Sequence, residues 1–178
     1  MALLQPTVSV NRVTDITAEL IRAMKADTIL LDVDNTLATH GSQEPFAGSI
    51  EWTHSMREAG LKIIIVSNNY PDRVAPFAEK YDLPFLCRAY KPLPSGYYRA
   101  AGIMGAKRRQ VVVVGDQIFT DIIGANFSGM KSILLTPEKE EDSLSFRIRR
   151  RLEKPLRRKL ERKGIHLPAR KQHQEGKV

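Results

Sequence analysis

The chain has 178 residues, and 42% of them are hydrophobic, which is enough for one domain with a buried core and a short appendage. The net charge of +8 is uneven: residues 143–178 carry 13 basic and three acidic side chains, a net of +10, whereas the other 142 residues have a net charge of −2. Cys87 is the only cysteine, which excludes an intrachain disulfide and favours a reducing compartment such as the cytoplasm. The first six residues lack the basic start of a secretory signal, and no apolar stretch approaches the roughly 20 residues that cross a bilayer.

Strands and helices are predicted to alternate along most of the chain. The first dozen residues have no clear pattern, and Thr14 or Asp15 is expected to cap a short amphipathic helix that ends at Lys25. Short apolar runs typical of buried parallel strands follow at 28–31, 61–66, 84–87, 111–114 and 131–135. Helices are expected between them, at about 46–59, 71–81, 95–104 and 121–127. This alternation predicts an α/β domain of the Rossmann-like type, with about five parallel strands and helices on both faces.

Polar side chains follow the ends of these predicted strands. They are Asp32 and Asp34, Ser67, Lys91, and Asp116 with Asp121. The carboxyl ends of parallel strands lie at one edge of the sheet, so we expect these groups to converge there. Taken alone, Asp32 and Asp34 also fit a solvated turn that closes a strand, and the later polar positions favour a site instead.

These residue types suit phosphate chemistry beside a metal ion. Asp32 can act as a nucleophile on phosphorus, and Asp34 can protonate the leaving oxygen and then deprotonate water. Asp32 and Asp116 offer the carboxylates that Mg²⁺ prefers. Lys91 can offset negative charge, and the Ser67 hydroxyl with nearby backbone N–H groups can hold phosphoryl oxygens.

Four ordered segments resemble the motifs of the haloacid dehalogenase (HAD) superfamily of phosphatases. They are Asp32-Val-Asp-Asn-Thr36, Val66-Ser-Asn68, Lys91-Pro92 and Gly115-Asp-Gln-Ile-Phe-Thr-Asp121. The resemblance covers residues 28–135 and implies an aspartyl-phosphate mechanism. It implies catalytic roles for Asp32, Asp34, Ser67 and Lys91, and substrate contacts from Ser67, Asn68 and Lys91. It further implies a Mg²⁺ site made by Asp32, the main-chain carbonyl of Asp34 and Asp116, with Asp121 either as a further ligand or in contact with the ligands.

The intervals between the motifs leave no room for a large cap domain, because residues 37–66 and 68–90 suffice only for the crossovers of the sheet. An open site in this superfamily suggests a large substrate, or a small one enclosed by an oligomer partner. Leu4-Gln-Pro6, the first motif and the basic tail also resemble the YqeG-like branch, which is related to phosphatidylglycerophosphate phosphatases. Phosphatidylglycerophosphate is therefore the expected substrate. The alternatives are a phosphatase of a soluble sugar or nucleotide phosphate, and a nucleic-acid-binding protein with a vestigial HAD domain.

The basic tail is predicted to be a separate helical extension, residues 143–167, after a domain that spans residues 1–142. Apolar residues recur every fourth position among its arginines and lysines, at Ile148, Leu152, Leu156 and Leu160. Pro155 is expected to break or restart the helix. Three roles compete: contact with an anionic membrane on its inner face, contact with nucleic acid phosphates, and packing of the leucines on the domain. Residues 168–178 are expected to be disordered.

Overall fold

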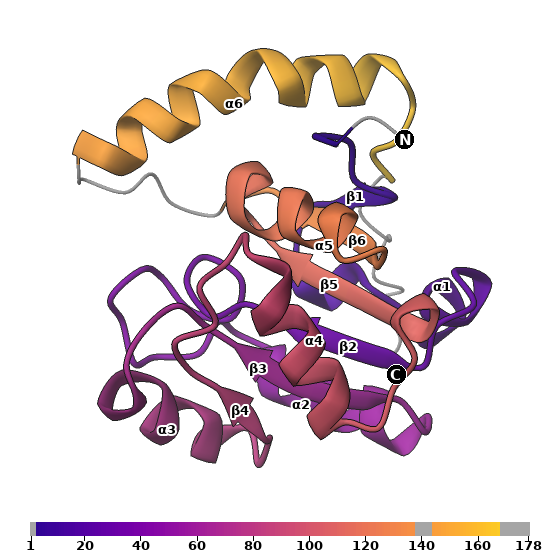
Figure 1. The fold of residues 1–178 in the computed structure, drawn as a ribbon, viewed down its shortest axis with the longest axis vertical. Helices are drawn as coiled ribbons and strands as arrows, with labels where there is room; N and C mark the ends of the chain where they lie inside the picture. Colours follow the sequence, from indigo (N-terminus) through magenta and orange to yellow (C-terminus); the bar gives the residue numbers. More distant parts are fainter. Residues whose placement is uncertain (1–2, 138–143, 168–178) are drawn as a thin grey trace, which may run out of the picture.

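The computed structural model describes residues 3–137 and 144–167, and within them the core is one parallel sheet of six strands (Figure 1). The order across the sheet is β1-β6-β5-β2-β3-β4, and every neighbouring pair is parallel. The strands are β1 (Val8–Val10), β2 (Thr28–Leu31), β3 (Lys62–Val66), β4 (Phe85–Leu86), β5 (Val111–Gly115) and β6 (Lys131–Leu135). The predicted Rossmann-like α/β class is thus confirmed.

Alternation along the buried strands assigns their side chains to two separate cores. Ile29 and Leu31 of β2 belong to one hydrophobic cluster, and Leu30 between them belongs to the other. This follows from the two-residue period of a strand, and it explains why these strands are apolar on both faces. Helices α1 (Ala18–Ala23), α2 (Ser49–Glu58) and α3 (Pro71–Lys80) cover the first face, and α4 (Pro94–Ile103) and α5 (Ile123–Phe127) cover the second.

β2 lies at the point where the strand order changes direction. From β2 the chain adds β3 and β4 on one side, and it then returns to add β5 and β6 on the other. The crevice at the carboxyl ends of the strands opens at such a point in parallel α/β sheets. Asp32 follows β2 directly, and its N–H donates to the carbonyl of Val114 in β5 at 2.9 Å. The main chain at Asp32 is therefore fixed by the sheet at the centre of this crevice.

The edge strand β1 was not predicted, because the first dozen residues show no clear pattern in the sequence. Val8 to Val10 pair in parallel with Ile133 to Leu135 of β6. Three residues are too few to show a strand period, and the partner lies about 125 positions away, so no local signal identifies the strand. The expected cap of the following helix was also wrong: Thr17, rather than Thr14 or Asp15, caps α1, and its hydroxyl accepts from Leu20 N–H at 3.2 Å.

The basic tail forms one helix, α6 (Leu144–Arg162), which lies along the β1 and β6 end of the sheet (Figure 1). Leu160 is buried against Ile118, Ile122 and Leu134, with Leu156 at the margin of this cluster. The helix continues through Pro155, so the predicted break there is wrong. Pro155 is exposed, and Glu153 before it and Leu160 after it are buried against the body, which anchors the helix on both sides of the missing hydrogen bond.

After α6 the chain reaches the free edge of β1. Ser9 N–H donates to the carbonyl of Ile165 at 3.0 Å, and Leu167 N–H donates to the carbonyl of Ser9 at 2.8 Å. This single parallel bridge covers part of the edge that β1 presents. The expected disordered segment 168–178 lies outside the described residues. Across the described ranges, no helix combines the length and the apolar content needed to cross a bilayer.

Candidate active site

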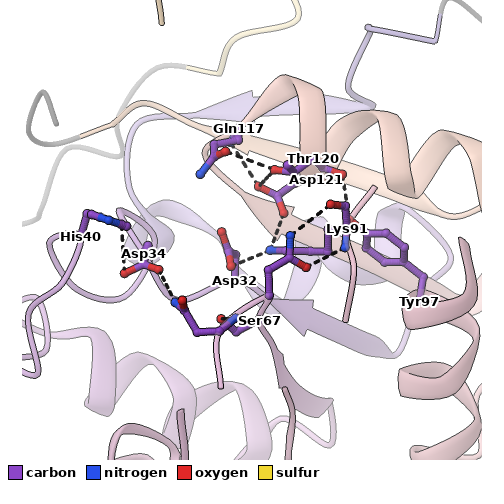
Figure 2. Close-up of polar contacts among 11 residues, drawn as sticks. Asp32, Asp34, His40, Ser67, Lys91, Tyr97, Gln117, Thr120 and Asp121 are labelled. Atoms are coloured by element: carbon purple, nitrogen blue, oxygen red, sulfur yellow. Dashed lines mark hydrogen bonds and ion pairs between the residues drawn. The ribbon is translucent and has the colours of Figure 1, made fainter. Parts of the chain in front are cut away.

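Residues from all the predicted motifs meet around one cavity at the carboxyl edge of the sheet (Figure 2). Its volume is about 140 Å³. The residues that line it come from four connections, and they are Asp32, Asp34, His40, Ser67, Asn68, Asn69, Lys91, Gln117 and Thr120. The sheet topology therefore brings together positions that lie as much as 88 residues apart in the chain.

Lys91 is the central cation of the site. Its Nζ lies 2.6 Å from Asp32 Oδ1 and 2.8 Å from Asp121 Oδ1, and Figure 2 shows the ammonium pointing between these carboxylates. Burial alone would lower the pKa of Lys91, but the charges of Asp121 and Asp32 outweigh it and raise the pKa above its ordinary value. Lys91 is therefore protonated at neutral pH, which keeps a positive charge beside Asp32.

Three buried carboxylates form a cluster with the chemistry of a metal site. Asp32, Asp116 and Asp121 each offer an oxygen within 4.8 Å of the others. Burial raises the pKa of the Asp32 carboxyl well above its ordinary value, against the opposing charge of Lys91, and two neighbouring carboxylates add to the rise. One ammonium cannot neutralise three carboxylates, so a divalent cation fits this residue set by charge as well as by ligand type. The predicted contribution of the Asp34 carbonyl stays a prediction.

Asp121, which contacts Lys91, lies in a widened helical turn just before α5. The helix predicted at 121–127 begins earlier, as a π-helical turn, η3 (Ile118–Ile122), and such turns often occur at functional sites. The Asp121 carboxylate lies directly over Gly115, where an added Cβ would come within 2.3 Å of Cγ and Oδ2. Only glycine at position 115 permits this approach, so Gly115 is part of the positioning of Asp121.

Asp34 has different surroundings from Asp32. Asn69 Nδ2 donates to its Oδ2 at 2.9 Å, and Gly41 N–H donates to Oδ1 at 3.3 Å. Arg73 Nη2 and His40 Nδ1 lie 3.4 and 3.5 Å from Oδ1. The carboxylate thus lies outside the three-carboxylate cluster but borders the same cavity, where a group can exchange protons with a substrate or with water.

Ser67 and Asn68 follow β3, as predicted, but their side chains have different partners. Ser67 lines the cavity, and its Oγ accepts from the N–H of Asn69 at 3.2 Å. The Asn68 amide spans the main chain of Lys91: its Nδ2 donates to the Lys91 carbonyl at 3.1 Å, and its Oδ1 accepts from the Lys91 N–H at 2.6 Å. The Asn68 side chain therefore fixes the Lys91 loop, and its predicted substrate contact stays a prediction.

Sequence reasoning missed two neighbours of Asp34. Asn69 lies one position beyond the second motif, and this position is a sequence signal that could have identified its amide as a contact of the site. Arg73 lies in the first turn of α3, where a basic residue is ordinarily solvated, so its sequence context gave no signal. His40 is 3.5 Å from the Asp34 carboxylate and lines the cavity, although no metal-ligand spacing marks it in the sequence.

Comparison with known proteins adds an independent line of evidence. The family model described as haloacid dehalogenase-like hydrolase matches residues 38–129. A Bacillus subtilis (strain 168) protein named probable phosphatase YqeG is 36% identical over 159 residues, which cover 89% of this chain and 92% of the relative.

Solved structures agree in fold. A cobalt-bound deoxy-D-mannose-octulosonate 8-phosphate phosphatase from Haemophilus influenzae superposes with a TM-score of 0.52 at 11% identity, covering 63% of this chain and 69% of that one. An uncharacterized protein from Listeria monocytogenes serotype 4b gives a TM-score of 0.53 at 15% identity, covering 65% and 84% of the two chains. At these identities the likeness concerns the fold alone.

Proposed function

Because the chain belongs to the haloacid dehalogenase-like hydrolase family and is a phosphoric monoester hydrolase by its relatives, we propose that it works through an aspartyl-phosphate at Asp32 and requires Mg²⁺. One observation carries the proposal. Asp32 is buried beside the cation of Lys91 and two further carboxylates, whereas Asp34, two residues on, borders the cavity outside that cluster. The two acids thus have the separate environments that two different roles require.

The proposed reaction has two displacements at phosphorus. A carboxylate oxygen of Asp32 attacks the phosphorus, the bond to the alcohol oxygen breaks, and Asp34 gives its proton to that leaving oxygen. Asp34, now ionised, takes a proton from water as the water oxygen attacks the phosphorus. The bond to Asp32 breaks, which releases phosphate and regenerates the free carboxylate. Lys91 keeps positive charge beside the attacking oxygen throughout.

A bound Mg²⁺ would be held by Asp32, Asp116 and Asp121, and it would supply charge neutralisation at the transferring phosphoryl group. The Ser67 hydroxyl and the N–H groups beside it would hold the remaining phosphoryl oxygens.

A phosphatase screen tests this proposal. Purified protein is offered a panel of phosphomonoesters, with Mg²⁺ added or with a chelator present, and released phosphate is measured. We expect hydrolysis that depends on Mg²⁺ and that disappears in the chelator. Equal hydrolysis with and without the metal would contradict the metal requirement.

We further propose that the substrate is a lipid phosphate, phosphatidylglycerophosphate. The cavity of about 140 Å³ is well below the roughly 300–1,000 Å³ of pockets that enclose a whole small ligand. It suits a phosphoryl group whose alcohol stays outside. Two exposed surfaces of the protein support this proposal.

The first surface, here called the rim, consists of Tyr70, Arg88, Tyr90 and Leu93. Tyr70, Tyr90 and Leu93 are each more than half exposed. Tyr70 and Tyr90 are next in sequence to the cavity residues Asn69 and Lys91, and Leu93 lies two residues after Lys91. The Arg88 guanidinium lies 4.8 Å from the centre of the Tyr70 ring, and Tyr90 has a φ of 55°. Tyrosine and arginine are favoured where an apolar phase meets anionic headgroups, and a strained residue with an exposed ring suggests function.

The second surface is the outer face of α6. Arg151, Lys154, Arg158, Lys159 and Arg162 are all exposed there. Their charge suits the anionic inner face of a membrane, at about 1 kcal/mol for each basic residue near the surface. We propose that this face and the rim keep the protein peripheral on that membrane.

A paired substrate assay tests the lipid proposal. Phosphatidylglycerophosphate in anionic vesicles is compared with glycerol phosphate and with soluble sugar and nucleotide phosphates under the same Mg²⁺ concentration. We expect kcat/KM for the lipid to exceed every soluble ester by at least about 100-fold. A soluble ester hydrolysed as efficiently as the lipid would favour the soluble alternative.

A further inference from the structure

A buried carboxylate connects helix α6 to the chain segment that follows β5. Glu153 is only 1% exposed, although it lies in the most basic segment of the described chain. Its Oε1 accepts from the main-chain N–H of Ile118 at 2.8 Å. Ile118 begins η3, two residues after Asp116. The contact therefore holds one end of the short connection that carries Asp116.

Arg157 holds the other end of the same connection. Its guanidinium donates from Nη2 to the main-chain carbonyl of Asp116 and from Nη1 to the carbonyl of Leu135 at 3.0 Å. It also pairs with Glu153 Oε2 at 3.3 Å, one helical turn away. A single planar fork thus joins the ends of β5 and β6 to α6, and the fixed donor geometry of arginine suits such a junction.

Packing alone does not account for this pair. Leu156 and Leu160 already supply apolar contact between α6 and the body. A buried charged residue costs free energy unless its hydrogen bonds are made, and an apolar residue of similar size would pack with less cost. Both polar side chains bond main-chain atoms of this segment, the carbonyl of Asp116 and the N–H of Ile118, so their benefit lies in where they hold it.

We propose that Glu153 and Arg157 are positioning residues that fix the Asp116–Ile118 segment for binding Mg²⁺. This inference rests on the proposed function, since it assumes that Asp116 is a metal ligand. It gives the basic tail a second role, because the inner face of α6 shapes the active site while its outer face stays available for a partner.

Direct binding of Mg²⁺ to the full-length protein tests the inference, measured by calorimetry without substrate. Glu153→Ala and Arg157→Ala remove the two contacts. Glu161→Ala and Arg158→Ala are matched controls, because they change the same charges at exposed positions of the same helix. Glu153→Gln is the conservative variant, since its amide oxygen can still accept from Ile118 N–H. Circular dichroism and the melting temperature of each variant establish that it is folded.

We expect the Kd for Mg²⁺ to rise at least about tenfold in Glu153→Ala and Arg157→Ala, and to stay within about twofold of wild type in both controls. Glu153→Gln should recover most of the affinity. Folded Glu153→Ala and Arg157→Ala proteins with the affinity of their controls would overturn the inference and leave α6 a packing element. If Glu153→Ala does not fold, the Kd for Mg²⁺ of Arg157→Ala is compared with that of Arg158→Ala, and the same tenfold difference is expected. Wild-type protein that binds no Mg²⁺ would instead refute the metal requirement of the proposed function, and this inference with it.

Discussion

Asp32 and Asp34 are separated by one residue, yet their carboxylates meet different partners. Asp32 contacts Lys91 at 2.6 Å and belongs to the three-carboxylate cluster, whereas Asp34 accepts from the Asn69 amide at 2.9 Å outside that cluster. Removing the charge of each residue should therefore have separable consequences for metal binding and for proton transfer.

Asp32→Asn keeps the shape of the side chain but removes the charge proposed to attack phosphorus and one of the proposed metal ligands. We expect kcat to fall by at least about 1,000-fold and Mg²⁺ binding to weaken. Asp34→Asn should also lower kcat strongly, because both proton transfers are lost, while Mg²⁺ affinity changes less. Calorimetry and steady-state kinetics check both. Asp32→Asn with more than a tenth of wild-type kcat would end the covalent mechanism.

Gly115→Ala tests the close approach of Asp121. The new methyl would lie 2.3 Å from the Asp121 carboxyl carbon, so the side chain must shift, and we expect its 2.8 Å contact with Lys91 to be disturbed. We expect kcat to fall at least about tenfold and stability to fall by about 1–3 kcal/mol, the usual cost of overpacking. Gly102→Ala in α4 is the control, because nothing lies within 4 Å of its added Cβ and it should not destabilise. Equal activity in both variants would show that Asp121 does not need this position.

At this scale the sequence predicted the residues that directly follow buried strands. Asp32, Ser67 and Asp116 were identifiable because a parallel sheet places strand ends together. The buried position of Glu153 could not be identified from the sequence, because charged residues in a basic helix are ordinarily exposed. Its hydrogen-bond partner is also a main-chain N–H, that of Ile118. Every residue except proline has a main-chain N–H, so the residue types in the sequence do not indicate which one donates to such a carboxylate.

The strands with apolar runs of four or more residues could be predicted from the sequence. The short edge strand β1 and the packing of α6 on the body could not. Val111 to Val114 is a strand under any interpretation of its β-branched residues. The leucine spacing of the tail predicted an apolar face, but not that the face meets η3 and β6. The body supplies that docking surface, and docking also lets the helix continue through Pro155.

The outer face of α6 can be tested without disturbing its inner face. Deleting the helix would remove buried Leu160 and Glu153, so substitution of exposed residues is the better experiment. Arg151→Glu, Lys154→Glu and Arg158→Glu together should weaken binding to anionic vesicles by roughly 100-fold or more, at about 1 kcal/mol for each lost cation. Added salt should weaken wild-type binding as well.

The matched control for that triple variant is Arg99→Glu, Lys107→Glu and Arg109→Glu, which makes the same charge change at exposed positions away from α6. Sedimentation with vesicles measures both proteins. If the two triple variants bind equally, the outer face of α6 has no specific role at the membrane.

The stability of the whole molecule should depend jointly on pH and Mg²⁺. Because burial raises the folded-state pKa of Asp32, its protonated form stabilises the metal-free protein at low pH, and this contribution is lost as the pH rises through the raised value. Mg²⁺ competes with that proton, so it should stabilise more at pH 8 than at pH 5.

At 100 times its Kd, Mg²⁺ should raise the Tm at pH 8 by about 5 to 10 °C. Scanning calorimetry at both pH values, with and without the metal, measures the difference. Asp32→Asn should lose most of the pH dependence of this shift. A shift that is larger at pH 5 would contradict the assignment of Asp32 as a titrating ligand.

The bridge between β1 and the residues after α6 affects how the chain is made. Ser9 and His166 are 157 positions apart. At about 5 to 20 residues per second, the ribosome adds the later partner roughly 8 to 30 seconds after the earlier one. Until then β1 presents an open edge, to which strands of other nascent chains could add. Completion of this edge is therefore a late event of synthesis, and truncated translation products that end before residue 165 would keep it exposed.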